Sequence, residues 1–157
     1  MRPVPVGDLD PSGPERRRAA RERALELLYE AEAKGVPVEQ VVAELPVPPD
    51  DLAVELALGV DAHRERIDAE LARRVAPRWS VSRLAAVDRA VLRIGTYELF
   101  EVPERSKAVI LNEAVVLARR FGTDDSPRFV NGVLSAIAAD ARPPAGDGAA
   151  PAPDGEG

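Results

Sequence analysis

Residues that could carry out catalysis are scarce in this sequence. His63 is the single histidine, and cysteine is absent, which removes a thiolate nucleophile, a disulfide framework and a thiolate metal site. His63 falls at the margin of an apolar helical stripe that includes Ile67, so we expect a half-buried histidine with a hydrogen-bond partner. The sequence contains no glycine-rich phosphate loop. We therefore expect no catalytic residue, no metal ion and no cofactor.

Cationic side chains are concentrated at the start of the first predicted helix. Burying unpaired guanidinium groups costs several kcal/mol, and cations at a helix N-terminus are disfavoured by the helix dipole. A helix start that projects past the edge of the core would instead present these groups to phosphates. A solvated charge run is the alternative interpretation. The cluster consists of Arg16, Arg17, Arg18, Arg21 and Arg23, opposed within that stretch only by Glu22.

A second candidate binding feature lies at the start of the last predicted helix. Ser126 followed by Pro127 is typical of a helix start, with serine as the cap and proline at the first helical position. Phe129 falls at the edge of the apolar stripe, and Arg128 falls on the side expected to face water. An aromatic ring beside a cation could stack on a base while the cation contacts a phosphate. The alternative is that Phe129 lines the core.

The elements that must position these residues are helical throughout, because apolar residues recur at helical spacing and none alternates as in a strand. Gly35 and Asp50 are expected to cap helices, and Trp79 is expected to fill the joint between two sub-bundles. The sequence predicts an all-α fold, a bundle of about seven helices in two packed sub-bundles. Helices are expected at 14–34, 38–45, 51–75 and 87–101, in a segment that ends at Phe121, and at 126–139.

Length and composition indicate one domain flanked by two tails. Residues 1–14 and 140–157 are rich in proline and glycine, so we expect a disordered N-terminal tail, a helical domain over 15–139 and a disordered acidic C-terminal tail. Most of the net charge of −6 falls in these tails, which leaves the helical domain only mildly acidic. No apolar run approaches about 20 residues, and no signal layout is present, so we expect a cytoplasmic protein without membrane contact.

Four stretches together resemble the NusB family of transcription antitermination factors. They are RRRAARERALELLYEAEAKG at 16–35, LGVDAHRERID at 58–68, WSVSRLAAVDRAVLRIGTYEL at 79–99 and NEAVVLARRFGTDDSPRFVNGVLSAIA at 112–138. The resemblance implies a NusB-like helical bundle that binds boxA-type single-stranded RNA together with NusE, a ribosomal protein of the small subunit. It implies an antitermination complex with RNA polymerase and other Nus factors on ribosomal RNA transcripts, without catalysis. It also allows a homodimer.

The resemblance implies roles for individual residues only where they match the family's motifs. On this interpretation, Arg17→Glu combined with Arg21→Glu abolishes RNA binding and leaves the helical circular-dichroism signal unchanged. Tyr29 and Asp88 are expected at the NusE interface. The expected RNA-binding residues are Arg16, Arg17, Arg18, Arg21, Arg93, Asp125, Arg128, Phe129 and Asn131.

Two alternatives remain open from the sequence alone. The same helical module resembles the RNA-binding domain of ribosomal RNA cytosine methyltransferases, but a catalytic domain of that class would need a Rossmann-type half and a catalytic cysteine, and this sequence has neither. The other alternative is a helical protein-interaction scaffold that does not bind RNA, for which charge reversal in the arginine cluster would leave function intact.

Overall fold

The computed structural model describes residues 13–142, and the expected tails lie largely outside these residues. Within them the chain forms helices and no strand, which confirms the expected all-α fold of about seven helices. None of the described helices is both long enough and apolar enough to cross a membrane. The helices are α1 (Pro14–Lys34), α2 (Val38–Ala43), α3 (Asp51–Ala62), α4 (Arg64–Val75), α5 (Ala86–Glu101), α6 (Lys107–Phe121) and α7 (Ser126–Ala141), with a 3-10 turn, η2, at Val81–Arg83.

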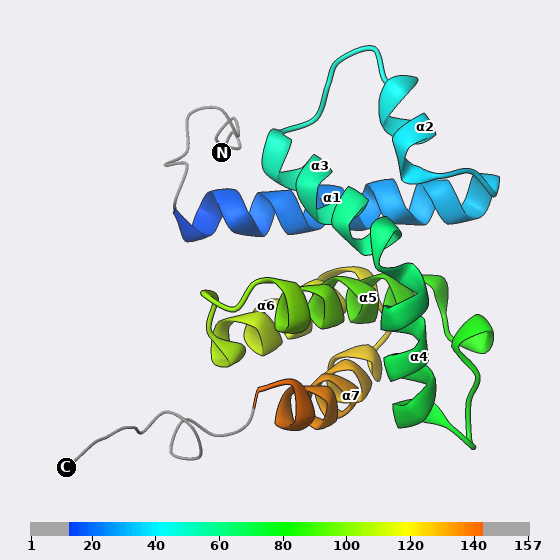
Figure 1. Cartoon of the computed structure of the whole chain (residues 1–157), viewed down its shortest axis with the longest axis vertical. Helices are drawn as coiled ribbons and strands as arrows, with labels where there is room; N and C mark the ends of the chain where they lie inside the picture. The colour runs from blue at the N-terminus through cyan, green and yellow to red at the C-terminus, as the bar shows by residue number, and fades with distance from the viewer. Residues whose placement is uncertain (1–12, 143–157) are drawn as a thin grey trace.

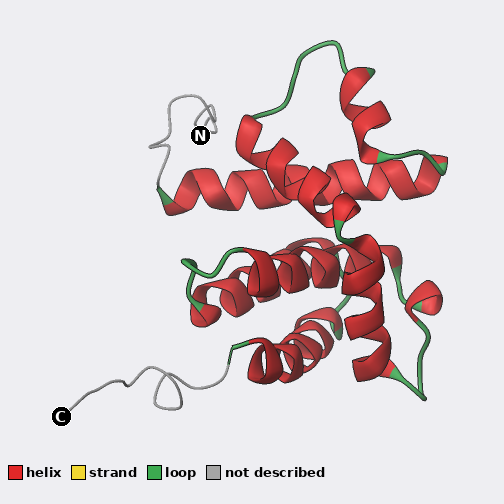
Figure 2. Ribbon diagram, in the orientation of Figure 1, coloured by secondary structure: helices red, strands yellow, loops and turns green. Residues whose placement is uncertain are grey.

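The helices form two packed groups, as expected from the sequence. Figures 1 and 2 show α1, α2 and α3 on one side and α4, α5, α6 and α7 on the other. Helix α5 lies at the centre and contacts α1, α3, α4, α6 and α7. Its residues from Arg89 to Thr96 are all buried, because a helix covered on several sides has no solvent face. The two groups therefore meet around α5.

Local sequence signals fix several helix ends. Gly35 ends α1 in the left-handed conformation, with φ of 68°, which glycine adopts without a steric penalty. The Asp50 side chain accepts a hydrogen bond of 2.8 Å from the Leu52 amide at the start of α3, as an N-cap does. Both expected caps are confirmed.

The expectation of one helix over 51–75 is wrong, because the chain breaks at His63. This residue has φ of −107° and ψ of 17°, and it separates α3 from α4. Helix α3 packs against α5 so closely that a Cβ on Gly59 would lie 2.4 Å from the Tyr97 ring. The His63 Nδ1 atom lies 2.8 Å from the Gly59 carbonyl oxygen and is half-buried as expected. The break lets α3 lie across α1 while α4 follows the other group (Figure 1).

Two expectations near the chain's connections also need correction. Trp79 does not fill the joint between the groups, because 46% of its surface is exposed. Helix α7 begins after Asp125 rather than with Ser126 as its cap, and the Ser126 hydroxyl instead accepts a hydrogen bond of 2.9 Å from the Thr123 amide. Helix α7 also continues to Ala141, and the following Arg142 donates hydrogen bonds to carbonyl oxygens at the end of α5.

Candidate functional site

Two arginines at the start of α1 form ion pairs at the protein surface. Arg16 donates to both carboxylate oxygens of Asp50 at 3.1 and 3.0 Å, which ties α1 to the cap of α3. Arg18 donates to Glu113 on α6 at 2.9 and 2.7 Å, and 50% of its side chain stays exposed. Arg17, between them, is partly exposed. The helix start therefore presents cations that also hold neighbouring helices in place.

Arg21 does not project from the core, so the expectation that it contacts a phosphate is wrong for this conformation. Only 2% of the residue is exposed, and its guanidinium group binds the carboxylate of Glu98 at 2.9 and 2.8 Å. Arg105 donates to the same carboxylate at 2.5 Å. Burial of a guanidinium group requires such a partner, and Glu98 in the last turn of α5 supplies it.

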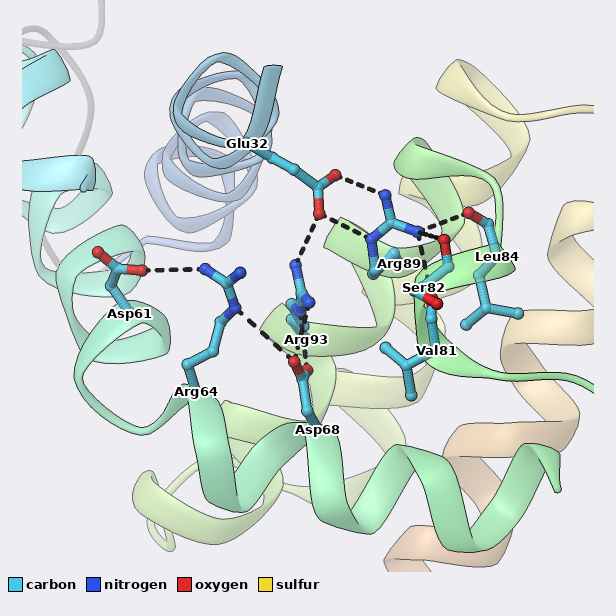
Figure 3. Close-up of polar contacts among 9 residues, drawn as sticks. All are labelled: Glu32, Asp61, Arg64, Asp68, Val81, Ser82, Leu84, Arg89 and Arg93. Carbon is cyan, nitrogen blue, oxygen red and sulfur yellow. Dashed lines mark hydrogen bonds and ion pairs between the residues drawn. The ribbon is translucent and has the colours of Figure 1, made fainter. Parts of the chain in front are cut away.

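Arg93 is also directed inward, contrary to the expected phosphate contact. Only 8% of it is exposed, and it donates to both oxygens of Asp68 on α4 at 2.9 Å. Figure 3 shows Glu32 of α1 between Arg93 and Arg89, with contacts of 3.3 Å to Arg93 and of 2.8 and 2.6 Å to Arg89. The joint between the two groups is therefore filled by ion pairs. Arg89 also donates to the carbonyl oxygens of Val81, Ser82 and Leu84.

The charged joint makes the stability of the protein depend on acidic pH. The hydrogen bond from Arg89 holds the pKa of Glu32 below its ordinary value of 4.5. A lowered folded-state pKa contributes stability that is fully present above the unfolded value and is lost as the pH falls through the folded value. We expect the free energy of unfolding to fall more steeply with acid in the wild type than in Glu32→Gln, measured by urea unfolding from pH 7 downward.

A matched control for this measurement is Glu26→Gln, because Glu26 pairs only with Arg23 at the surface and exposed pairs contribute little. The Glu26→Gln variant should keep the acid dependence of the wild type. Equal slopes in wild type and Glu32→Gln would contradict the role of Glu32. Glu113, whose pKa is lowered by the hydrogen bond from Arg18, should supply part of the dependence that remains.

The residues expected around the start of α7 do not gather in one place. Asp125 and Phe129 line a depression of about 440 Å³ on one side of the helix, together with Asp88. Arg128 and Asn131 line a different cleft of about 500 Å³, between α6 and α7. Phe129 is partly buried against the core and Arg128 is exposed, as the helical spacing predicts. The start of α7 therefore separates two candidate subsites.

The two residues expected at a protein interface lie near each other. Tyr29 is 49% exposed, and it lines a depression of about 340 Å³ with Val87 and Phe121. Val87 directly precedes Asp88, which lines the neighbouring depression beside Phe129. One carboxylate oxygen of Asp88 is buried without a hydrogen-bond partner among the described residues. An exposed aromatic ring that lines an apolar depression suits contact with a protein partner.

Of the arginines with an unpaired side chain, all except Arg128 are additional to the residues expected from the sequence. Arg83 lines the same depression as Phe129 and the exposed Trp79, and Arg119 lines the same cleft as Arg128. The order Arg78–Trp79, a cation beside an aromatic ring, was a signal for such a surface, but tryptophan was assigned to the core. Within residues 13–142, the arginines whose side chains make no hydrogen bond or ion pair are Arg78, Arg83, Arg119 and Arg128.

The amino-acid sequence is similar to a known protein family and to several of its members. The NusB family matches residues 18–139. Transcription antitermination protein NusB of Thermobifida fusca is 46% identical over 125 residues, covering 77% of this chain and 87% of that protein. The protein of the same name from Salinispora arenicola is 46% identical over 129 residues, covering 78% and 94%.

Solved structures agree with the sequence comparison. NusB of T. maritima matches with a TM-score of 0.70 and 35% identity, covering 79% of this chain and 91% of that chain. A chain in a crystal structure of antitermination factors NusB and NusE in complex with double-stranded RNA matches with a TM-score of 0.69 and 28% identity. That match covers 82% of this chain and 99% of the other.

The fold and surface define a class of protein: a small all-helical protein with ion pairs in the joint between two helical groups and an unpaired arginine side chain beside an exposed tryptophan. Such a surface is suited to binding another molecule. Within this class the chain belongs to the NusB family.

Proposed function

We propose that this chain is a transcription antitermination factor that binds boxA-type single-stranded RNA together with NusE on ribosomal RNA transcripts. The observation that carries the proposal is the match to a chain of a complex of NusB and NusE with double-stranded RNA, which extends over 99% of that chain. The single-stranded boxA-type target is what the sequence resemblance implies. The proposed activity is binding, without catalysis. We also propose that the protein acts in the cytoplasm, as part of a complex with RNA polymerase and other Nus factors.

The proposed RNA-binding face runs from the start of α1 across α6 to the start of α7. Arg18 contacts Glu113 on α6, and the neighbouring residue Asn112 lines the cleft beside Arg128. The cations at the start of α1 are therefore adjacent to the α6–α7 cleft. On the other side of α7, Phe129 with Asp125 extends the face. Arg16, Arg17 and Asn131 complete the proposed contacts.

Arg21 and Arg93 are assigned a different role in this proposal. Both guanidinium groups are buried and paired with carboxylates, so they hold the helices that carry the face and do not contact RNA in this conformation. The remaining cations should give RNA binding that is weak and sensitive to salt, because phosphate contacts release counterions.

The proposed NusE surface includes Tyr29 and Asp88. Asp88 lies in the depression that also contains Phe129, so the protein partner and the RNA would meet beside α5. Two ligands that each cover part of one site raise the affinity of the assembly without new contacts on either surface. NusE should therefore strengthen RNA binding.

The direct test is a fluorescence anisotropy titration of a labelled single-stranded boxA-type RNA, with and without purified NusE. We expect binding that tightens when NusE is added and weakens as salt rises. A duplex of the same sequence and an unrelated single strand serve as comparisons. The proposal fails if the chain binds NusE but the pair has no preference for the boxA-type strand over the unrelated strand.

Phe129→Leu is expected to weaken binding of single-stranded RNA by about 1–3 kcal/mol, because a flat ring that stacks on a base contributes that amount. Leucine keeps the apolar contact that the partly buried side chain makes with the core. The Kd from anisotropy and the melting temperature should be measured together. Phe129→Tyr, which retains the ring, is the control and should bind like the wild type. Unchanged affinity in Phe129→Leu would mean that the ring only lines the core.

A further inference from the structure

The only two asparagines in the sequence lie in the same cleft. Asn112 on α6 and Asn131 on α7 are separated by 19 positions, yet both line the cleft of about 500 Å³ between these helices. Arg119 and Arg128 line it as well, and all four side chains belong to exposed residues. The remaining lining is apolar and consists of Ala108, Leu111, Val115 and Pro127.

Helix stability does not explain these two asparagines. Asparagine favours helix caps and turns, where its side chain can bond to the backbone, and it is a poor helix former in the interior. Asn112 lies in the sixth position of α6 and Asn131 in the sixth position of α7, so neither caps its helix. Neither side chain makes a hydrogen bond within the described part of the chain. Their donors and acceptors are left available to a ligand.

The two arginines in the cleft differ from the other arginines nearby. Arg120, the neighbour of Arg119, pairs with Glu22 at 2.7 Å, and Arg18 pairs with Glu113. Arg119 and Arg128 have no carboxylate partner in residues 13–142, and no acidic residue lines the cleft. A planar guanidinium group that is not engaged by a carboxylate can bind a phosphate with two parallel hydrogen bonds.

We propose that this cleft binds one nucleotide of the RNA strand and reads its base. The apolar lining would contact the face of the base, while the carboxamides of Asn112 and Asn131 hydrogen-bond its edge. Arg119 and Arg128 would hold the adjoining phosphates. This inference rests on the proposed RNA-binding function and adds Asn112 and Arg119 as a specificity residue and a phosphate contact. An acidic peptide would engage the arginines, but paired carboxamide donors and acceptors beside an apolar lining match the edge and face of a base, so we favour RNA as the ligand.

Side-chain amide NMR provides a direct test, because the chain has two asparagines and a single glutamine, Gln40. Gln40 lies on α2 and donates to Glu44 at 3.3 Å, on the opposite helical group, so it is an internal reference. In a titration with single-stranded boxA-type RNA, the amide signals of Asn112 and Asn131 should shift and those of Gln40 should not. RNA binding without movement of either asparagine signal would overturn the inference and leave the proposed function standing.

Variants separate base reading from phosphate binding. Asn112→Ala with Asn131→Ala should reduce discrimination between the preferred RNA and strands with one base changed by about 5- to 100-fold, with an unchanged salt dependence. Alanine is the better helix former, so the fold should be kept. Arg119→Gln and Arg128→Gln should each weaken binding of all strands and lower the slope of log K against log salt by about 0.7. Arg73→Gln, which removes a cation that pairs with Glu70 on α4, is the control and should change neither quantity.

The remaining outcomes are also decisive. A wild type that binds no RNA, alone or with NusE, overturns both the function and this inference. Discrimination that is unchanged in the double asparagine variant overturns the inference alone. A poly-glutamate peptide that shifts the same asparagine signals as strongly as RNA, and competes with it equally, would reassign the cleft to an acidic protein partner. Inorganic phosphate should shift neither asparagine signal.

Discussion

Glu98→Ala is expected to lower the free energy of unfolding by about 3–5 kcal/mol, because removal of one partner leaves a buried charge uncompensated. The Glu98 carboxylate is 1% exposed, and it receives both hydrogen bonds from Arg21 and a third from Arg105. Without it, the remaining carboxylate near Arg21 is that of Glu113, at 3.9 Å. Urea unfolding followed by circular dichroism at pH 7 measures the loss.

Two controls distinguish a buried charge from a general effect of mutation. Arg21→Met with Glu98→Leu removes both charges and keeps the volume, so it should recover most of the lost stability. Glu26→Ala breaks an exposed pair with Arg23 and should cost less than about 1 kcal/mol. A loss below 1 kcal/mol in Glu98→Ala would mean that water reaches Arg21. The same burial predicts that Arg21→Glu unfolds the protein, so the Arg17→Glu, Arg21→Glu pair should lose its helical circular-dichroism signal rather than keep it.

The helices and their apolar faces could be predicted from the sequence because both depend on residues close together in the chain. Helix α6 follows the spacing of Ile110, Ala114, Leu117 and Ala118, all of which are buried, and it ends at Phe121 as expected. Capping by Asp50 depends on an amide two residues away. Helix propensity and capping act between residues a few positions apart, and no tertiary contact in these segments opposes them.

The inward direction of Arg21 could not be predicted, because its partner Glu98 is 77 positions away in the sequence. A helical wheel of α1 shows only that Arg21 lies beside the apolar stripe, and the cost of burial argues for exposure unless a partner is known. Arg93 presents the same difficulty, with Asp68 and Glu32 brought to it by two other helices. Ion pairs between distant segments depend on the packing that they help to define.

The break at His63 and the exposure of Trp79 were missed for a related reason. The apolar stripe over 51–75 continues through the break, so periodicity alone indicated one helix. The close approach of Gly59 to Tyr97 that accompanies the break involves another helix. Trp79 was assigned to the core by residue type, yet Arg89 and Arg93 with their carboxylates occupy the joint. Of the two asparagines in the cleft between α6 and α7, the sequence predicted an RNA contact for Asn131 but not for Asn112.

Arg89→Ala is expected to cost about 3–5 kcal/mol of stability and to weaken RNA binding as well. The side chain donates to both oxygens of Glu32 and to the carbonyl oxygens of Val81, Ser82 and Leu84. Its loss leaves the Glu32 carboxylate with a weaker partner and removes the side-chain donor from the buried Leu84 carbonyl. The same bonds order the segment that carries Trp79 and Arg83 beside Phe129, so one substitution should affect both the fold and the proposed face.

Hydrogen exchange separates these two effects. The amides of Arg83 and Leu84 donate hydrogen bonds within the 3-10 turn. In Arg89→Ala these amides should exchange faster than the rate set by global unfolding of the variant. Amides in α7 should exchange at the rate set by global unfolding. Arg89→Lys keeps the charge but cannot reach all these acceptors, because lysine lacks the planar fork of donors, so it should rescue stability only in part. Arg64→Ala, which removes an exposed pair in the same network, should leave exchange at the turn unchanged. If the Leu84 amide of Arg89→Ala exchanged as slowly as in the wild type, the turn would be held without Arg89. RNA binding by the folded variant should then equal that of the wild type.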